Sequence, residues 1–312
     1  MSNNKFLPEG LLVGTQENNE YITSLYGLER ARQEGKILEG IVSLCDSDTF
    51  TLHVDLCGVD GIIPRTEAML GDDIKDIAII TRVGKAVAFK VLQIINEEGK
   101  RPCAILSRKE AQRECLNSYI LDLIPGDIIP ARVTHFEPFG AFVDIGCGIV
   151  SLMSVDSISV SRIPGPQERF KLREQIKVVV KNIDYETGRI YTSTRELLGS
   201  WEENASKFSV GQTVSGIVRS VEDYGIFVEL APNLAGLAEL KDGVKAGQSC
   251  AVYIKSIVPE KMKIKLVIID TYDTIAQRKP LDYFVDTNEV THIDYWKYSP
   301  ASCDRIVETR FE

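Results

Sequence analysis

The chain has 312 residues, of which 44% are hydrophobic and 26% are charged, and its formal net charge is −9. This composition is typical of a folded protein with two or three domains, and it excludes a disordered chain. Since no apolar run of about 18 residues and no leader-like N-terminus occur, we expect no membrane span and a cytoplasmic location.

The first predicted element is a helix in the N-terminal segment 1–34. In ENNEYITSLYGLERARQEG (17–35), apolar and aromatic residues recur at helical spacing, as at Tyr21, Leu25 and Tyr26. Gly35 is a typical helix stop, because glycine readily takes the left-handed conformation at a helix end. The helix should lead directly into the first domain.

Three sequence repeats follow, at 35–114, 125–197 and 210–270. The second begins GDIIPARVTHFEPFGAFVDI and the third GQTVSGIVRSVEDYGIFVEL, and both reach an aromatic-Gly pair after the same number of residues. The first, GKILEGIVSLCDSDTFTLHVDL, has two extra residues before Phe50 and is degenerate. Apolar and polar residues alternate in each, which predicts half-buried antiparallel strands.

Each repeat continues with a short strand, a long strand and a last strand. The short strands are marked by GIIP, SLMS and GLAE. Five strands in about 70 residues, with a connection after the third, are the pattern of the five-stranded OB-fold barrel. The third repeat is shortened at that connection, so we expect its usual helix to be missing.

The connectors at 107–124 and 193–208 are helix-like and too apolar for floppy linkers. The C-terminal extension, 271–312, has no repeat partner, and THIDYWKYSP and DRIVETRF within it predict extra strands. The predicted fold is therefore all-β, with three tandem OB-fold barrels, an N-terminal helix, helical connectors and a β-rich C-terminal extension.

The motif FGAFVDI (139–145), the turn before the third strand and the terminal strand with Ser-Arg or Ser-Lys resemble the S1-type RNA-binding repeat of the ribosomal protein S1 family. The resemblance covers roughly 35–270. It implies a non-enzymatic protein that binds single-stranded RNA or mRNA, is linked to translation and contacts the small ribosomal subunit. Both a ribosomal subunit and a free paralogue fit this resemblance.

Aromatic residues would form the stacking surface, since every base offers a π-face. We expect Phe139 and Phe142 in the second repeat, and Tyr224 and Phe227 in the third, to serve this purpose. Residues three apart in a regular strand lie on opposite faces, so a bulge at the intervening glycine should bring each pair onto one face. The alternative is that these rings fill a barrel or an interface between barrels.

In repeat one, Phe50 and His53 keep the spacing, but Thr51 stands where the glycine belongs, so its stacking surface is doubtful. Family members often carry a histidine after the Gly-Leu (GL) turn, at the places that Pro64, Ser154 and Glu239 hold in this chain. That histidine is absent here, and Glu239 at its place in repeat three would repel a phosphate.

The acid and base that the resemblance implies near the last turn are present in repeat two as Asp184 and Arg189. Repeat three offers Lys263, flanked by Lys261 and Lys265. The second and third repeats are nearly neutral, and the acidity is concentrated mostly in termini and connectors. Binding should therefore be centred on repeat two, with repeat three as a helper.

No catalytic site, metal, cofactor or small-molecule substrate is expected. The seven cysteines form no CxxC pair, there is no GxxxxGK[ST] motif, and His292, Asp294 and Cys303 match no metal-ligand spacing. An enzyme would need a further domain for which no residues remain. The competing hypothesis is a docking protein on the ribosome or RNA-processing machinery, with vestigial RNA binding.

Overall fold

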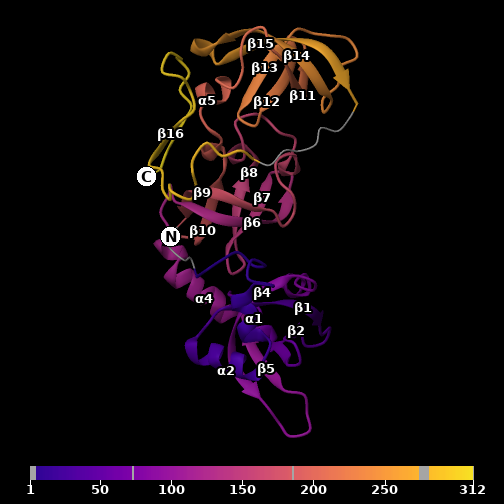
Figure 1. Cartoon of the computed structure of the whole chain (residues 1–312), viewed down its shortest axis with the longest axis vertical. Helices are drawn as coiled ribbons and strands as arrows, with labels where there is room; N and C mark the ends of the chain where they lie inside the picture. Colours follow the sequence, from indigo (N-terminus) through magenta and orange to yellow (C-terminus); the bar gives the residue numbers. More distant parts are fainter. Residues whose placement is uncertain (1–4, 72–73, 185, 274–280, 312) are drawn as a thin grey trace. The chain divides into compact units, whose positions relative to one another are not determined.

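The computed structural model describes residues 5–71, 74–184, 186–273 and 281–311. They contain three closed five-stranded β-barrels, called barrels one, two and three here, which confirm the predicted fold class (Figure 1). Barrel one consists of β1 (Leu38–Cys45), β2 (Leu52–Asp55), β3 (Asp60–Ile63), β4 (Ala86–Ile95) and β5 (Cys103–Ser107). Barrel two consists of β6 (Ile128–Glu137), β7 (Gly140–Gly146), β8 (Ile149–Ser154), β9 (Gln175–Asp184) and β10 (Arg189–Ser193). Barrel three consists of β11 (Thr213–Glu222), β12 (Gly225–Ala231), β13 (Leu234–Ala238), β14 (Ser249–Val258) and β15 (Lys263–Tyr272).

The barrels share one strand order. The first strand lies between the second and the fourth, and the third strand pairs in parallel with the fifth. Alternation along the strands separates the core from the outer face, as in β15, where Ile264 and Leu266 are buried while Lys263 and Lys265 are exposed. The closed ring leaves no unpaired strand edge, which is the OB-fold solution to edge pairing.

Each core is built from inward aliphatic and aromatic residues. In barrel one, Leu52, Phe89 and Leu106 are completely buried, and helix residues Leu28 and Ala31 belong to the same cluster. The helices that precede barrel one are thus part of its core. Removing a large side chain from such a site typically costs about 2–5 kcal/mol.

The predicted single N-terminal helix is in fact two helices, α1 (Gln16–Ile22) and α2 (Leu25–Glu34). The break occurs because Ser24 is extended and its hydroxyl accepts the Gly27 N–H at 3.0 Å, a favourable N-cap. A side chain at Gly27 would lie 2.4 Å from the Tyr21 carbonyl oxygen, so the tight turn requires glycine there. The predicted stop is correct, since Gly35 ends α2 with φ of 62°.

The predicted helical connectors are present. The first contains α4 (Arg108–Ser118) and the 3₁₀ turn η2 (Ile120–Asp122). The second is less regular than expected, with a 3₁₀ turn, η5 (Arg195–Leu198), and a short helix, α5 (Trp201–Ala205). Ser200 and Glu203 form a capping box at the start of α5, which explains why the helix begins there.

The connection between the third and fourth strands differs among the barrels. Barrel one has η1 (Arg65–Glu67) and α3 (Asp76–Ile80), and barrel two has only the 3₁₀ turns η3 (Val155–Ser157) and η4 (Pro166–Glu168). In barrel three, no helix occurs in the described residues 239–248, as predicted. A 3₁₀ turn, η6 (Pro259–Lys261), joins its last two strands.

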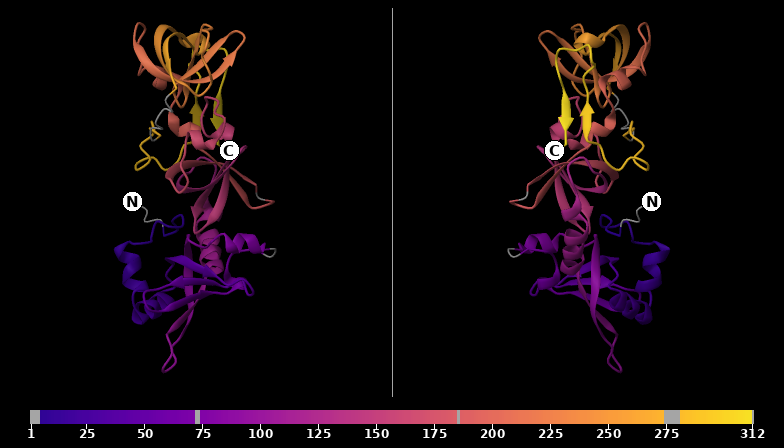
Figure 2. Two further views of the ribbon diagram at one scale, coloured as in Figure 1. Left: turned by 90° about the vertical axis from the view of Figure 1, so that its right-hand side faces the viewer. Right: turned by 90° about the vertical axis from the view of Figure 1, so that its left-hand side faces the viewer.

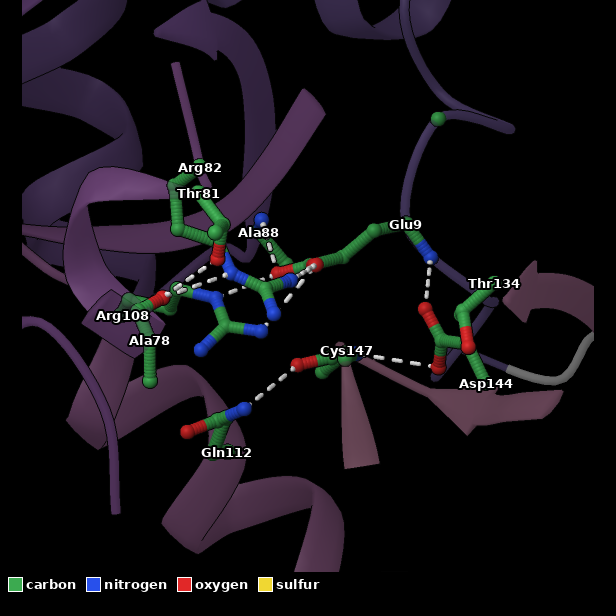
Figure 3. Close-up of polar contacts among 12 residues, drawn as sticks. Glu9, Ala78, Thr81, Arg82, Ala88, Arg108, Gln112, Thr134, Asp144 and Cys147 are labelled. Carbon is green, nitrogen blue, oxygen red and sulfur yellow. Dashed lines mark hydrogen bonds and ion pairs between the residues drawn. The ribbon is translucent and has the colours of Figure 1, made fainter. Parts of the chain in front are cut away.

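A buried charged cluster holds the N-terminal segment (Figure 3). Arg108 donates through Nε to Glu9 Oε1 at 2.6 Å, and the Glu9 N–H donates to Asp144 Oδ2 at 2.7 Å. The N–H groups of Gly146 and Gly148 donate to Asp144 Oδ1 at 2.9 and 3.0 Å. Burial, with the nearby Glu9 carboxylate, raises the pKa of Asp144 to about 7. The cluster is structural, because each charged group meets an opposite charge or backbone N–H groups.

The C-terminal extension is less regular than predicted. Its described residues, 281–311, contain two short paired strands, β16 (Tyr295–Lys297) and β17 (Glu308–Arg310), and are otherwise irregular (Figure 2). No helix in the described part of the chain is long and apolar enough to cross a membrane.

Candidate nucleic-acid interface

The β6–β7 hairpin of barrel two brings Phe139 and Phe142 together. Their rings meet edge to face, with centroids 6.2 Å apart and planes at 82°. Phe139 lies in the turn just before β7 and is 55% exposed, whereas Phe142 lies in the strand and is half-buried. An exposed ring beside a half-buried one offers a surface on which a flat base can stack.

Barrel three repeats this arrangement. Tyr224 is 70% exposed in the β11–β12 turn, and its ring meets that of Phe227 edge to face at 6.0 Å and 86°. The predicted bulge at the glycine is wrong here, since Gly225 pairs regularly with Glu222. The pair shares a face because Tyr224 lies in the turn and not in the strand.

Close packing of the neighbouring strand explains why a glycine, Gly140 or Gly225, follows each exposed aromatic residue. A side chain at Gly140 would lie 2.3 Å from the Met153 carbonyl oxygen, and one at Gly225 would lie 2.6 Å from the Ala238 carbonyl oxygen. Only glycine permits this close approach of the neighbouring strand. The irregularity in strand pairing lies instead in β11, between Val218 and Ser220.

A row of paired residues crosses the outer face of barrel three. Directly paired residues on neighbouring strands point to the same face of the sheet. The pairings place five partly or fully exposed side chains in this outer row: Ser220, Phe227, Leu237, Lys265 and Ser256. The row thus combines one aromatic ring with one cation.

The corresponding row of barrel two is richer in aromatic residues. His135 stacks on Phe142, with centroids 4.3 Å apart and planes at 7°. Tyr191 pairs with both Leu152 and Asn182, and it occupies the position that Lys265 has in barrel three. By correspondence with Phe227 and Leu237, which pair in barrel three, we assign the outer row of barrel two as His135, Phe142, Leu152, Tyr191 and Asn182.

Sequence reasoning missed His135 and Tyr191 as site residues. The signal for His135 was its position seven residues before Phe142, which equals the spacing of the paired Ser220 and Phe227. Tyr191 could have been found by counting two residues from Arg189, since residues two apart in a strand share a face.

Asp184 and Arg189 lie opposite each other at the end of the β9–β10 hairpin. The Asp184 carboxylate accepts hydrogen bonds from the Thr187 hydroxyl at 2.6 Å and from two backbone N–H groups. These bonds lower the pKa of Asp184, so its carboxylate stays negatively charged and holds the turn through its hydrogen bonds. Arg189 is exposed and lies two residues from Tyr191, on the same face, where it can meet a phosphate.

In barrel three, Lys263 and Lys265 are both exposed and alternate with buried Ile264. Lys265 lies in the outer row, and Lys263 lies two residues from it on the same face. Glu239, predicted to repel phosphate, has Lys255 Nζ 3.7 Å from its Oε1. This exposed pair offsets the local negative charge, which weakens the predicted repulsion.

The same row in barrel one is mostly aliphatic. Its members, set by the strand pairings, are Leu44, His53, Ile62, Ile105 and Gln93. Phe50 is half-buried, has φ of 54° and packs against the core cluster of the barrel, with Arg65 above its ring at 5.7 Å. Among its described residues, barrel one therefore has no aromatic pair like those of barrels two and three.

Tandem OB-fold barrels with outward aromatic pairs define a class of oligonucleotide-binding fold. Within it, the family model "S1 RNA binding domain" matches residues 122–195, which include all five strands of barrel two. The chain is 29% identical over 282 residues to the small ribosomal subunit protein bS1 of Rhizobium meliloti, covering 85% of this chain and 48% of that protein. It is 29% identical over 262 residues to the bS1 homolog of Bacillus cereus, covering 80% of this chain and 64% of that protein.

A solved multidomain protein with nucleic acid binding domains from Streptococcus pneumoniae is 16% identical, with a TM-score of 0.25, and covers 75% of this chain and 73% of that one. This TM-score is too low to establish a shared overall fold. The chain spans about half the length of the Rhizobium relative. The chain is thus similar to curated bS1 proteins over most of its length, and its barrel two matches the S1 RNA-binding domain.

Proposed function

We propose that this protein binds single-stranded RNA through the outer rows of barrels two and three, with barrel two as the principal reader. The observation that carries the proposal is the set of partly or fully exposed aromatic residues of barrel two. Phe139, Phe142, His135 and Tyr191 offer π-faces, and Arg189 stands beside them for a phosphate. Stacking tolerates any base, so the surface suits a strand of mixed sequence, such as mRNA.

The proposed setting is translation, as in the curated relatives named as small ribosomal subunit protein bS1. We infer a cytoplasmic protein that acts without a catalytic step of its own and contacts the small ribosomal subunit. Co-sedimentation with small subunits in moderate salt tests this setting. The alternative, a docking protein with vestigial RNA binding, gains no support from the outer rows.

The double variant Phe139→Ala and Tyr224→Ala tests the binding surface. Each lost stacked base should cost about 1–3 kcal/mol, so affinity for labelled oligouridylate should fall by roughly tenfold or more. Fluorescence anisotropy measures the dissociation constant, and circular dichroism checks that the variant is folded.

Tyr26→Ala is the matched control, because Tyr26 is also a highly exposed aromatic residue but lies on α2, outside the barrel strands. Its affinity should equal that of the unmodified chain. Undiminished binding by the folded double variant would overturn the stacking surface.

A further inference from the structure

The C-terminal segment 281–311, called the strap here, contacts barrel two. The Ile128 N–H donates to the Thr291 carbonyl oxygen at 2.8 Å, and the Ile293 N–H donates to the Gly126 carbonyl oxygen at 3.0 Å. Asp127 and His292 thereby form a β-bridge. Next to it is an apolar cluster of Ile128, Val179 and Leu197 with the strap residues Tyr283, Val285, Val290, Ile293 and Phe311.

The side chains of the bridged residues Asp127 and His292 also interact. His292 Nδ1 lies 2.7 Å from Asp127 Oδ1, and its Nε2 lies 3.3 Å from Asp294 Oδ1. The bond with Asp127, reinforced by Asp294, raises the pKa of His292. The strap is thus held to barrel two by backbone, apolar and charged contacts.

The strap also contacts barrel three. Trp296 and Tyr298 are buried members of the core cluster that fills barrel three. The Tyr298 hydroxyl donates to the Asn233 carbonyl oxygen at 2.6 Å, and the Trp201 N–H donates to the Tyr298 carbonyl oxygen at 2.9 Å. The strap therefore packs against the apolar cluster of barrel two and also into the core of barrel three.

Asn233 joins the two barrels directly. It is 0% exposed in the turn between β12 and β13 of barrel three. Its Oδ1 accepts the N–H of Val160, in the β8–β9 connection of barrel two, at 2.9 Å. Its Nδ2 donates to the carbonyl oxygens of Arg195 and Gly199 in the connector at 2.9 and 3.1 Å. A buried amide with these bonds admits only one arrangement of the segments around it.

Buried ion pairs reinforce this junction. Arg169, in the β8–β9 connection of barrel two, reaches Glu229 of β12 at 2.6 Å. Arg219 of β11 reaches the same carboxylate at 2.9 Å and Glu168 at 2.8 Å. Separation of the barrels would break the Arg169–Glu229 and Arg219–Glu168 pairs, whereas Arg219 and Glu229 lie in the same barrel and would stay paired. Most of barrel two, with all of barrel three and the strap, accordingly forms one compact unit.

From these contacts we propose that the strap and the Asn233 junction hold barrels two and three as one RNA-binding body, whose partner is a single RNA strand long enough to occupy both outer rows. This rests on the proposed function of those rows. Because the barrels are fixed before binding, the second row binds an attached strand at high effective concentration. Asn233 and Tyr298 act here as positioning residues, since neither belongs to an outer row.

The unmodified chain provides the first test. One barrel of this fold binds roughly 4–16 nucleotides, so oligouridylates of about 6 and about 20 nucleotides are compared in 0.15 M salt. We expect one long oligonucleotide per chain, bound at least about tenfold more tightly than the short one. Calorimetry measures the stoichiometry and the dissociation constant. Two long oligonucleotides per chain, or equal affinities for both lengths, would overturn the coupling.

The double variant Asn233→Ala and Tyr298→Phe removes the side-chain hydrogen bonds of the junction but leaves both outer rows intact. Its affinity for the short oligonucleotide should stay unchanged, while the gain for the long one should be lost. Asn288→Ala with Tyr295→Phe is the matched control, because both residues lie in the strap and are exposed, and the Tyr295 hydroxyl bonds Glu308 within the strap. The control should keep the gain.

The outcomes separate the two proposals. Short-oligonucleotide binding without a gain for the long one contradicts the coupled body and leaves the stacking surface intact. No binding of either oligonucleotide contradicts the proposed function, and the coupling with it. If the junction variant fails to fold, the stoichiometry of the unmodified chain decides.

Discussion

Barrels one and two have the same strand order but carry different outer rows. The row of barrel one has His53 where barrel two has Phe142, and Ile105 where barrel two has Tyr191. Most of the inward residues of both barrels are apolar. This difference indicates that the residues facing the core specify the barrel fold. The residues on the outer face are only weakly constrained by folding, and they specify what the barrel binds.

The largest effect is expected from a substitution in the core of barrel one. Phe89 is completely buried in β4. Phe89→Ala should destabilise the barrel by about 3–5 kcal/mol, because it removes a large side chain and leaves a cavity. Urea denaturation followed by circular dichroism measures the loss.

In native conditions, the same variant should bind oligouridylate within about twofold of the unmodified chain, because Phe89 belongs to the core of barrel one and to no outer row. Ile63→Val, a milder change in the same core, serves as the control for graded destabilisation. A loss of RNA affinity that follows the loss of stability in both variants would show that barrel one takes part in binding.

The second prediction compares equivalent outer positions. Phe142→Ala should weaken oligouridylate binding by about 1–3 kcal/mol, or roughly five- to 150-fold, because it removes the ring on which His135 and a base stack. His53→Ala, at the matching position of barrel one, should leave the dissociation constant unchanged. Fluorescence anisotropy of both folded variants provides the measurement, and equal losses would refute the assignment of barrel two as the reader.

The smallest expected effect concerns pH. The pKa of His292 is raised in the folded chain, chiefly by its hydrogen bond with Asp127, so the protonated form stabilises the fold. This contribution is fully present below the unfolded pKa of about 6.5 and is lost as the pH rises through the higher folded pKa. For a partly exposed pair it should be about 1 kcal/mol or less.

Thermal unfolding between pH 6 and pH 9 measures this dependence in the transition of barrels two and three. His292→Gln should remove it, while His53→Gln, in barrel one, should not. A pH dependence that persists in His292→Gln would assign the effect to another group.

The sequence alone predicted much of the architecture, because each barrel depends on local alternation and on the repeat. The common spacing to FGAF and YGIF predicted two matching barrels, and the short connection predicted the missing helix of barrel three. The split of the N-terminal helix escaped prediction, since Ser24 can cap a helix or lie within one, and the packing of Gly27 on Tyr21 decided between them.

Residue spacing also selected Phe139, Phe142, Tyr224 and Phe227 as candidates for stacking, and they remain a prediction that the binding experiments test. Only the tertiary structure stacked His135 on Phe142 and paired Tyr191 with Leu152, because strand register depends on pairings between segments far apart in the chain. The same holds for the strap, which has no counterpart in the sequence repeats. Its role is seen only in the tertiary structure, where the Tyr298 hydroxyl donates to the Asn233 carbonyl oxygen. Local pattern determines which strands form, and long-range pairing determines which side chains meet.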